Sequence, residues 1–123
     1  MRKINISNIV RNIYEFQLTH NKQHIGSCRL MINDHNATIN HIEINDSHKR
    51  QGHGSWLLQE TEKILKKDYH IEKISLLGWQ PSGSFEIVDF YKKNGYVNTY
   101  KHSNGVYDDY VTLFDLYRLD KKI

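Results

Sequence analysis

Residues 48–58, HKRQGHGSWLL, place cationic side chains and two glycines directly before an apolar stretch. The first N–H groups of a helix have no partner within the helix, and the helix dipole is positive at this end. Glycines at such a helix start allow a phosphate to approach backbone N–H groups that Cβ atoms would otherwise shield. The stretch therefore predicts an anion-binding loop. Its candidate ligand-binding residues are Lys49, Arg50, Gln51, Gly52, His53, Gly54 and Ser55.

Two common nucleotide-binding loops do not fit this stretch. A Walker loop places Lys and then Ser or Thr directly after its last glycine, whereas Ser55 follows Gly54 here. A dinucleotide-binding loop has a third glycine three residues after the second, where this sequence has Leu57. Nucleotide binding of the Walker type is thereby excluded, and NAD binding is disfavoured.

The framework that must position this loop is predicted by the hydrophobic periodicity of the chain. Alternation and short apolar runs predict strands, and apolar residues three and four apart predict two amphipathic helices. The predicted strands are 12–19, 25–32, 37–45, 73–79, 96–101 and 107–117. The first helix runs for about four turns from Gly52, and the second covers 84–94 and ends at Asn94-Gly95. Ser103-Asn104-Gly105 is a hairpin-turn signal.

The order β-β-β-α-β-α-β-β predicts an α/β fold for a single domain over 1–123. Its sheet should be mixed and mostly antiparallel, around a β-α-β-α core, because the first strands form a meander and a helical crossover joins parallel strands. Strict alternation in the third strand separates two faces. One face would carry Thr38, Asn40, Ile42 and Ile44, and the other Ile39, His41, Glu43 and Asn45.

A second block, residues 90–96 (FYKKNGY), lies about forty positions after the loop on the second predicted helix. Together the two blocks resemble the GNAT family of N-acetyltransferases, whose acyl-CoA loop reads Arg/Gln-x-x-Gly-x-Gly/Ala and whose later block reads Phe-Tyr-x-x-x-Gly-Phe/Tyr. Lys49 stands where Arg or Gln is usual. The resemblance covers about residues 12–117. It implies acetyl-CoA as co-substrate and direct transfer of the acetyl group to a primary amine.

The resemblance also implies roles for individual residues. Tyr91 matches the family tyrosine that faces the thioester sulfur and is the expected general acid. Ile42 and Ile44 lie on the strand that pairs with the pantetheine, and a backbone N–H near Ile44 is expected to meet the acyl oxygen. Ser84 stands where the family has a cofactor-binding Asn.

The general base is left open between two neighbouring residues of one strand. Glu43 is the first candidate, acting through water, and His41 is its rival. Each has a simpler interpretation as a solvated strand residue, and many enzymes of the family deprotonate the amine through ordered water alone.

The family usually has a first strand and two helices before the central strands, whereas about ten residues precede the strand of Tyr14 here. This compact form predicts an open acceptor side and favours a protein lysine or N-terminus as acceptor. A second copy in a homodimer is an alternative source of cover. The other functions kept open are acetylation of a small-molecule amine, and a catalytically weak CoA-binding or nucleic-acid-associated module.

Composition narrows the remaining classes of function. The net charge is only +3 and the basic residues are interleaved with acidic ones, which disfavours nucleic acid as a partner. With Cys28 alone no intrachain disulfide forms, and no histidine pair has metal-ligand spacing, so no metal is expected. A signal peptide and a membrane-spanning segment are not evident, which predicts a cytoplasmic protein without a membrane partner.

Overall fold

The computed structural model describes residues 1–48, 51–81, 86–107 and 113–123. The strands are β1 (Arg2–Val10), β2 (Ile13–His20), β3 (Gln23–Asn33), β4 (Asn36–Ile44), β5 (Lys73–Pro81), β6 (Val97–Tyr107) and β7 (Leu113–Lys122). The helices are the 3₁₀ helix η1 (Asp46–His48), α1 (His53–Asp68) and α2 (Glu86–Lys93). These residues form two compact units, Met1–Ile74 with Ile123 and Ser75–Lys122, which are described in turn. That 1–123 act as one domain stays a prediction.

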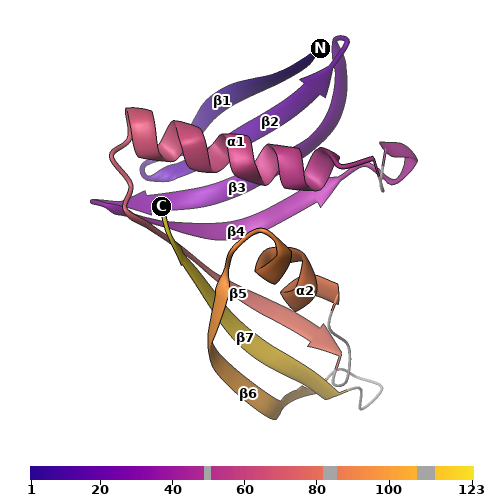
Figure 1. The fold of residues 1–123 in the computed structure, drawn as a ribbon, viewed down its shortest axis with the longest axis vertical. Coiled ribbons are helices and arrows are strands. Elements are labelled where there is room, and N and C mark those ends of the chain that lie inside the picture. The colour runs from indigo at the N-terminus through magenta and orange to yellow at the C-terminus, as the bar shows by residue number, and fades with distance from the viewer. Residues whose placement is uncertain (49–50, 82–85, 108–112) are drawn as a thin grey trace. The chain divides into compact units, whose positions relative to one another are not determined.

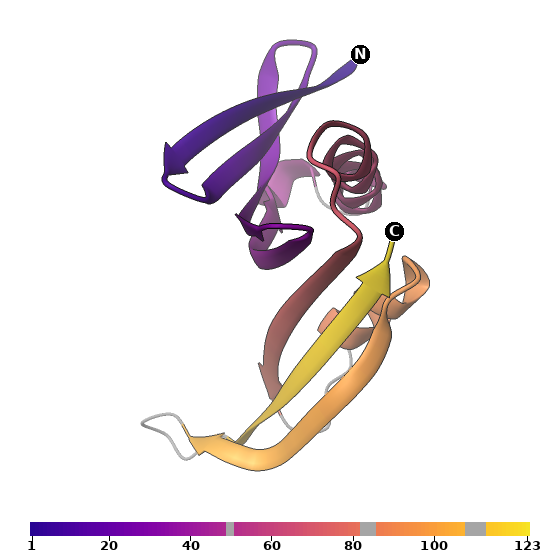
Figure 2. The ribbon, with the colours of Figure 1, turned by 90° about the vertical axis from the view of Figure 1, so that its left-hand side faces the viewer.

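In the first unit β1 to β4 form an antiparallel meander in chain order, and α1 lies along one face of it (Figure 1). Figure 2 shows α1 nearly end on, beside the strands of this sheet. The core lies between helix and sheet, because the apolar stripe of α1 meets the inward side chains of the strands. Its fully buried members include Phe16, Leu18, Ile25, Leu30, Leu57, Leu58 and Leu65.

The strand β1 is absent from the sequence-based prediction. It pairs with β2 from Arg2 opposite His20 to Val10 opposite Ile13, and the register shifts between Asn8 and Val10. All its side chains are exposed except Arg2 and Ile4, which are half-buried. An edge strand that buries few side chains has a weak apolar pattern, so its sequence does not predict a strand. Backbone hydrogen bonding to β2 holds β1 in the sheet.

The strict alternation predicted for the third strand is wrong, because β4 contains a bulge at Asn40. His41 lies opposite Arg29 but Ile39 lies opposite Leu30, which leaves Asn40 as an extra residue. Residues directly opposite in an antiparallel pair share a face. The bulge therefore returns apolar residues to the buried face. That face carries Ala37, Ile39, Ile42 and Ile44, and the other carries Thr38, His41 and Glu43.

In the second unit the strand order is β5-β7-β6, and α2 packs against β6 and β7 (Figure 1). The predicted stop after α2 is confirmed. Gly95 has φ +93°, its N–H donates to Lys92 O, and the N–H of Tyr96 donates to Tyr91 O, both at 3.0 Å. This is the Schellman arrangement, which a glycine in the left-handed region permits.

The predicted turn at Ser103-Asn104-Gly105 is wrong. These residues lie inside β6, which runs antiparallel to β7 from Val97 to Tyr107. The register between the two strands shifts between His102 and Val106, so the Asn-Gly pair coincides with an irregularity of the strand. Asn and Gly favour bulges as well as hairpin turns, and strand pairing decides between the two.

Candidate functional site

The start of α1 has the geometry expected of an anion-binding loop. Gly52 precedes the helix with φ +77° and ψ 4°, in the left-handed region where glycine is favoured. The helical hydrogen bonds begin where the N–H of Trp56 donates to Gly52 O at 3.1 Å. Gly54 and Ser55 precede Trp56 in the first turn. Among the described residues no side chain caps the helix, and its first turn contains no acidic residue. Backbone N–H groups and the positive end of the dipole thus lie together, with no carboxylate in the first turn of the helix.

Two of the predicted loop residues, Lys49 and Arg50, lie outside the described residues, and so does Ser84. Gln51 and Gly52 are exposed, whereas Gly54 and Ser55 are half-buried.

His53, the first residue of α1, packs inward instead of facing solvent. Its side chain is 4% exposed, and its ring lies edge to face with His20 at 5.7 Å and with His48 at 6.2 Å between centroids. Its Nδ1 atom has no hydrogen-bond partner among the described residues. Burial lowers the pKa of His53, and the charges of Arg2, His20 and His48 lower it further.

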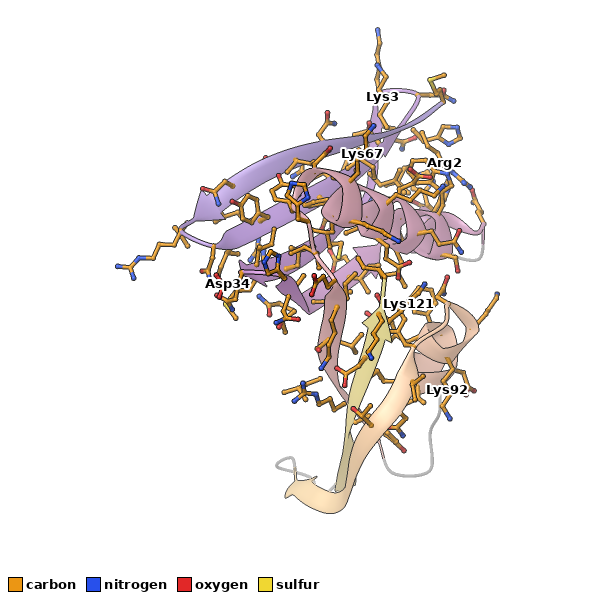
Figure 3. The ribbon with its side chains drawn as sticks, turned by 60° about the vertical axis from the view of Figure 1, so that its left-hand side comes forward. Arg2, Lys3, Asp34, Lys67, Lys92 and Lys121 are labelled. Atoms are coloured by element: carbon orange, nitrogen blue, oxygen red, sulfur yellow. The ribbon has the colours of Figure 1, made fainter. Side chains whose placement is uncertain are left out.

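Sequence reasoning missed Arg2, which lies beside the same loop. Its Nη2 atom is 3.4 Å from Gln51 O, and its guanidinium lies 5.3 Å from the centroid of the Trp56 ring. Figure 3 shows Arg2 next to the beginning of α1. No local signal points to this residue, because Arg2 and Gln51 are 49 positions apart and meet only through the pairing of β1.

The two candidate bases form a pair on the outer face of β4. His41 Nε2 lies 2.9 Å from Glu43 Oε2, and the side chains are 61% and 63% exposed. Ile42 and Ile44 are half-buried on the opposite face. Gly26 allows this end of β4 to lie close to β3, because a Cβ on Gly26 would be 2.3 Å from Glu43 O.

Tyr91 lies in the second unit within a group of three aromatic rings. It is 5% exposed, and its ring meets Phe90 and Tyr96 edge to face at 5.1 and 5.3 Å. Its carbonyl accepts the N–H of Tyr96 at the end of α2. The FYKKNGY block thus holds the backbone and the ring of Tyr91 in one position.

Cys28 has the surroundings of a structural thiol. It is completely buried, and burial, followed by the charge of Glu62, raises its pKa to about 12. A thiol of that pKa is protonated at neutral pH and is a poor nucleophile. Within the described part of the chain, no three His, Cys, Asp or Glu side chains are arranged to hold a metal ion.

The sequence matches the family model described as an acetyltransferase (GNAT) domain over residues 13–98. A match over more than half of the chain shows that the protein belongs to this family. The predicted fold and the predicted class of enzyme, an N-acetyltransferase, are thereby confirmed. A search of curated protein sequences found no match.

Several solved structures have the same fold at low sequence identity. An acetyltransferase from Bacillus subtilis in complex with CoA is 12% identical with a TM-score of 0.79, covering 100% of this chain and 99% of that chain. The ribosomal-protein-S18-alanine N-acetyltransferase of Escherichia coli is 19% identical with a TM-score of 0.79, covering 94% and 72%. A spermidine/spermine N-acetyltransferase of Vibrio cholerae is 19% identical with a TM-score of 0.76, covering 91% and 66%.

Among the described residues no helix is both long enough and apolar enough to cross a membrane.

Proposed function

We propose that this protein transfers the acetyl group of acetyl-CoA directly to a primary amine of a protein, either a lysine side chain or an N-terminus. The observation that carries the proposal is the start of α1, where Gly52 adopts φ +77° and, among the described residues, neither a side-chain cap nor an acidic residue of the first turn competes with an anion. This geometry suits the pyrophosphate of CoA. The CoA in the Bacillus subtilis relative supports the same co-substrate.

In the proposed reaction the amine first loses a proton to Glu43 through water, since only a neutral amine is a nucleophile. Its lone pair then forms the C–N bond with the thioester carbon, and the carbonyl electron pair moves onto oxygen. A backbone N–H near Ile44 stabilises that oxyanion. When the carbonyl re-forms, the C–S bond breaks and the thiolate takes a proton from the Tyr91 hydroxyl. The nitrogen, positively charged after the attack, loses one proton to water, and Tyr91 regains a proton from water, which leaves the neutral amide and free CoA.

The exposed position of Glu43 and His41 supports a bulky acceptor. Both side chains are more than half exposed on an open sheet face of the first unit, which a peptide segment can approach. The relatives act on different amines by their names, a ribosomal protein in one case and spermidine or spermine in another. A small polyamine is therefore the second candidate acceptor.

The proposal is tested by measuring ligand stabilisation and thiol release together. Acetyl-CoA at about 100 times its Kd should stabilise the native state by about 2.7 kcal/mol and raise the melting temperature by several degrees. Free CoA thiol should then appear with a peptide that has a free lysine or N-terminus, and not with the same peptide after both amines are blocked.

Three outcomes distinguish the alternatives. Thiol release with spermidine but not with peptides would identify a small-amine acetyltransferase. Stabilisation by acetyl-CoA without release from any amine would indicate a CoA-binding module. No stabilisation by any acyl-CoA would refute the proposal.

A further inference from the structure

We propose that Arg2 is a further cofactor-binding residue, whose guanidinium donates hydrogen bonds to a phosphate group of the acyl-CoA beside the start of α1. This inference rests on the proposed function and adds to it a binding residue from the N-terminal strand. The phosphate is either the pyrophosphate or the 3′-phosphate of the cofactor.

The position of the guanidinium is set by two contacts with the loop and its helix. Nη2 of Arg2 approaches Gln51 O at 3.4 Å, and the guanidinium lies over the Trp56 ring at 5.3 Å. The carbonyl contact is long and engages one nitrogen, whereas a guanidinium has five N–H donors in a planar fork suited to phosphate. The cation–π contact with Trp56 holds this fork at the loop before any ligand arrives.

The groups around the Arg2 guanidinium and the start of α1 favour the binding of an anion. Arg2 of β1, His20 of β2, His48 of η1 and His53 of α1 converge here, and the positive end of the α1 dipole adds to them. The first turn of α1 contains no carboxylate. His53, almost fully buried, has no described partner for Nδ1, and its pKa is lowered by burial and by Arg2 and its two histidine neighbours. A phosphate bound among these groups would interact favourably with the charge of Arg2 and would favour the protonated form of His53.

Arg2 lies outside the residues that match the family model. The family match begins at residue 13, so β1 lies before it. The adjacent Lys3 provides a matched control, because it has the same charge, is exposed, and points away from α1 (Figure 3). Strand geometry places the two side chains on opposite faces of β1.

The experiment measures the Kd of CoA and of 3′-dephospho-CoA by calorimetry, for the full chain and for Arg2→Gln, Arg2→Lys and Lys3→Gln, with any affinity tag at the C-terminal end. We expect Arg2→Gln to weaken CoA binding about tenfold, in line with loss of a charge-assisted pair. Arg2→Lys should recover part of this loss, and Lys3→Gln should change the Kd less than twofold. Because the interaction is ionic, the gap between the full chain and Arg2→Gln should shrink as NaCl rises from 50 to 300 mM.

The two cofactors identify which phosphate is bound. If Arg2→Gln weakens CoA but not 3′-dephospho-CoA, Arg2 binds the 3′-phosphate; equal weakening at low salt places it on the pyrophosphate. Wild-type affinity in Arg2→Gln overturns the inference. So does a loss that is independent of salt and is shared by Arg2→Lys, since that behaviour belongs to a residue that only supports the loop. Failure of the unmodified chain to bind CoA would instead refute the proposed function.

Discussion

Tyr91 tests the proposed chemistry at the scale of a single hydroxyl. Tyr91→Phe removes that hydroxyl and keeps the ring that packs against Phe90 and Tyr96. We expect kcat to fall at least about tenfold, because a general acid contributes a factor of this order or more. The Kd of CoA should stay within about twofold, because the proposed phosphate contacts involve the start of α1 and not this hydroxyl.

Tyr96→Phe is the matched control, since it alters a neighbouring ring of the same FYKKNGY block. It should leave kcat close to wild type. If Tyr91→Phe also keeps full turnover, Tyr91 has no part in the proton transfer and is a packing residue.

Single substitutions of Glu43 and His41 likewise distinguish which of the two residues is the general base. Glu43→Gln should lower kcat/KM about 100-fold if Glu43 is the base, within the range of general base catalysis. His41→Gln should have a smaller effect, because His41 then acts only on the orientation of the carboxylate 2.9 Å away. Steady-state kinetics of both variants decide the matter. A larger loss in His41→Gln would make His41 the base, and unchanged kinetics in both would indicate deprotonation by water.

Cys28 provides a prediction about stability and pH. Its pKa rises from 9.0 to about 12 on burial, so above pH 9 the thiol ionises only in the unfolded chain. The contribution of Cys28 to the free energy of unfolding is therefore complete below pH 9 and falls by about 1.4 kcal/mol per pH unit up to pH 12. Urea unfolding between pH 8 and 10.5 should show this slope in the wild type and a smaller one in Cys28→Ala. The variant should retain its turnover, and identical slopes would contradict the burial argument.

At the scale of elements, the contact between β3 and β4 depends on Gly26. A Cβ there would lie 2.3 Å from Glu43 O and 2.7 Å from the Cδ1 atom of Ile44. Gly26→Ala must therefore push the end of β4 away, and we expect a loss of about 1–3 kcal/mol in unfolding free energy, as in other overpacked sites. Acetyl transfer should decrease as well, because Glu43 and Ile44 move.

Ser27→Ala is the control for this change, since Ser27 is the next residue of β3 and its side chain lies on the other face, opposite Glu43. It should alter the unfolding free energy by less than about 0.5 kcal/mol. Equal stability of Gly26→Ala and Ser27→Ala in urea would show that the strands accommodate the methyl group.

The helices were more predictable than the strands, for a physical reason. Apolar spacing predicts one buried face of α1. Its members Leu57, Leu58, Thr61 and Leu65 are fully buried, and Ile64 is half-buried. The end of α2 follows from Asn94-Gly95 because a left-handed residue closes a helix locally. Glu62 of the same helix is buried as well, although its charge alone would favour an exposed position. For β1 and the interior of β6, no local pattern was decisive, since strand pairing depends on partners far along the chain.

At the scale of the whole molecule, the prediction of one domain is testable with the two tryptophans. Trp56 lies in α1 of the first unit and Trp79 in β5 of the second. Trp79→Phe and Trp56→Phe each leave one fluorescent probe. If 1–123 unfold as one cooperative domain, both probes should give the same urea midpoint, equal to that from circular dichroism. Different midpoints would show two units that unfold independently.

The sequence alone indicated the class of protein, through the resemblance of two motifs to those of the family, and it predicted the candidate loop, because such motifs record local backbone geometry. A glycine before a helix start and a glycine after a helix end leave signatures within a few residues, and HKRQGHGSWLL and FYKKNGY are those signatures. Only the tertiary structure decided that Ile39 shares a face of β4 with Ile42, and which side chains surround His53. A bulge at Asn40 and the approach of Arg2 to Gln51 arise from pairing between strands, and the spacing of residues along one segment does not contain that information.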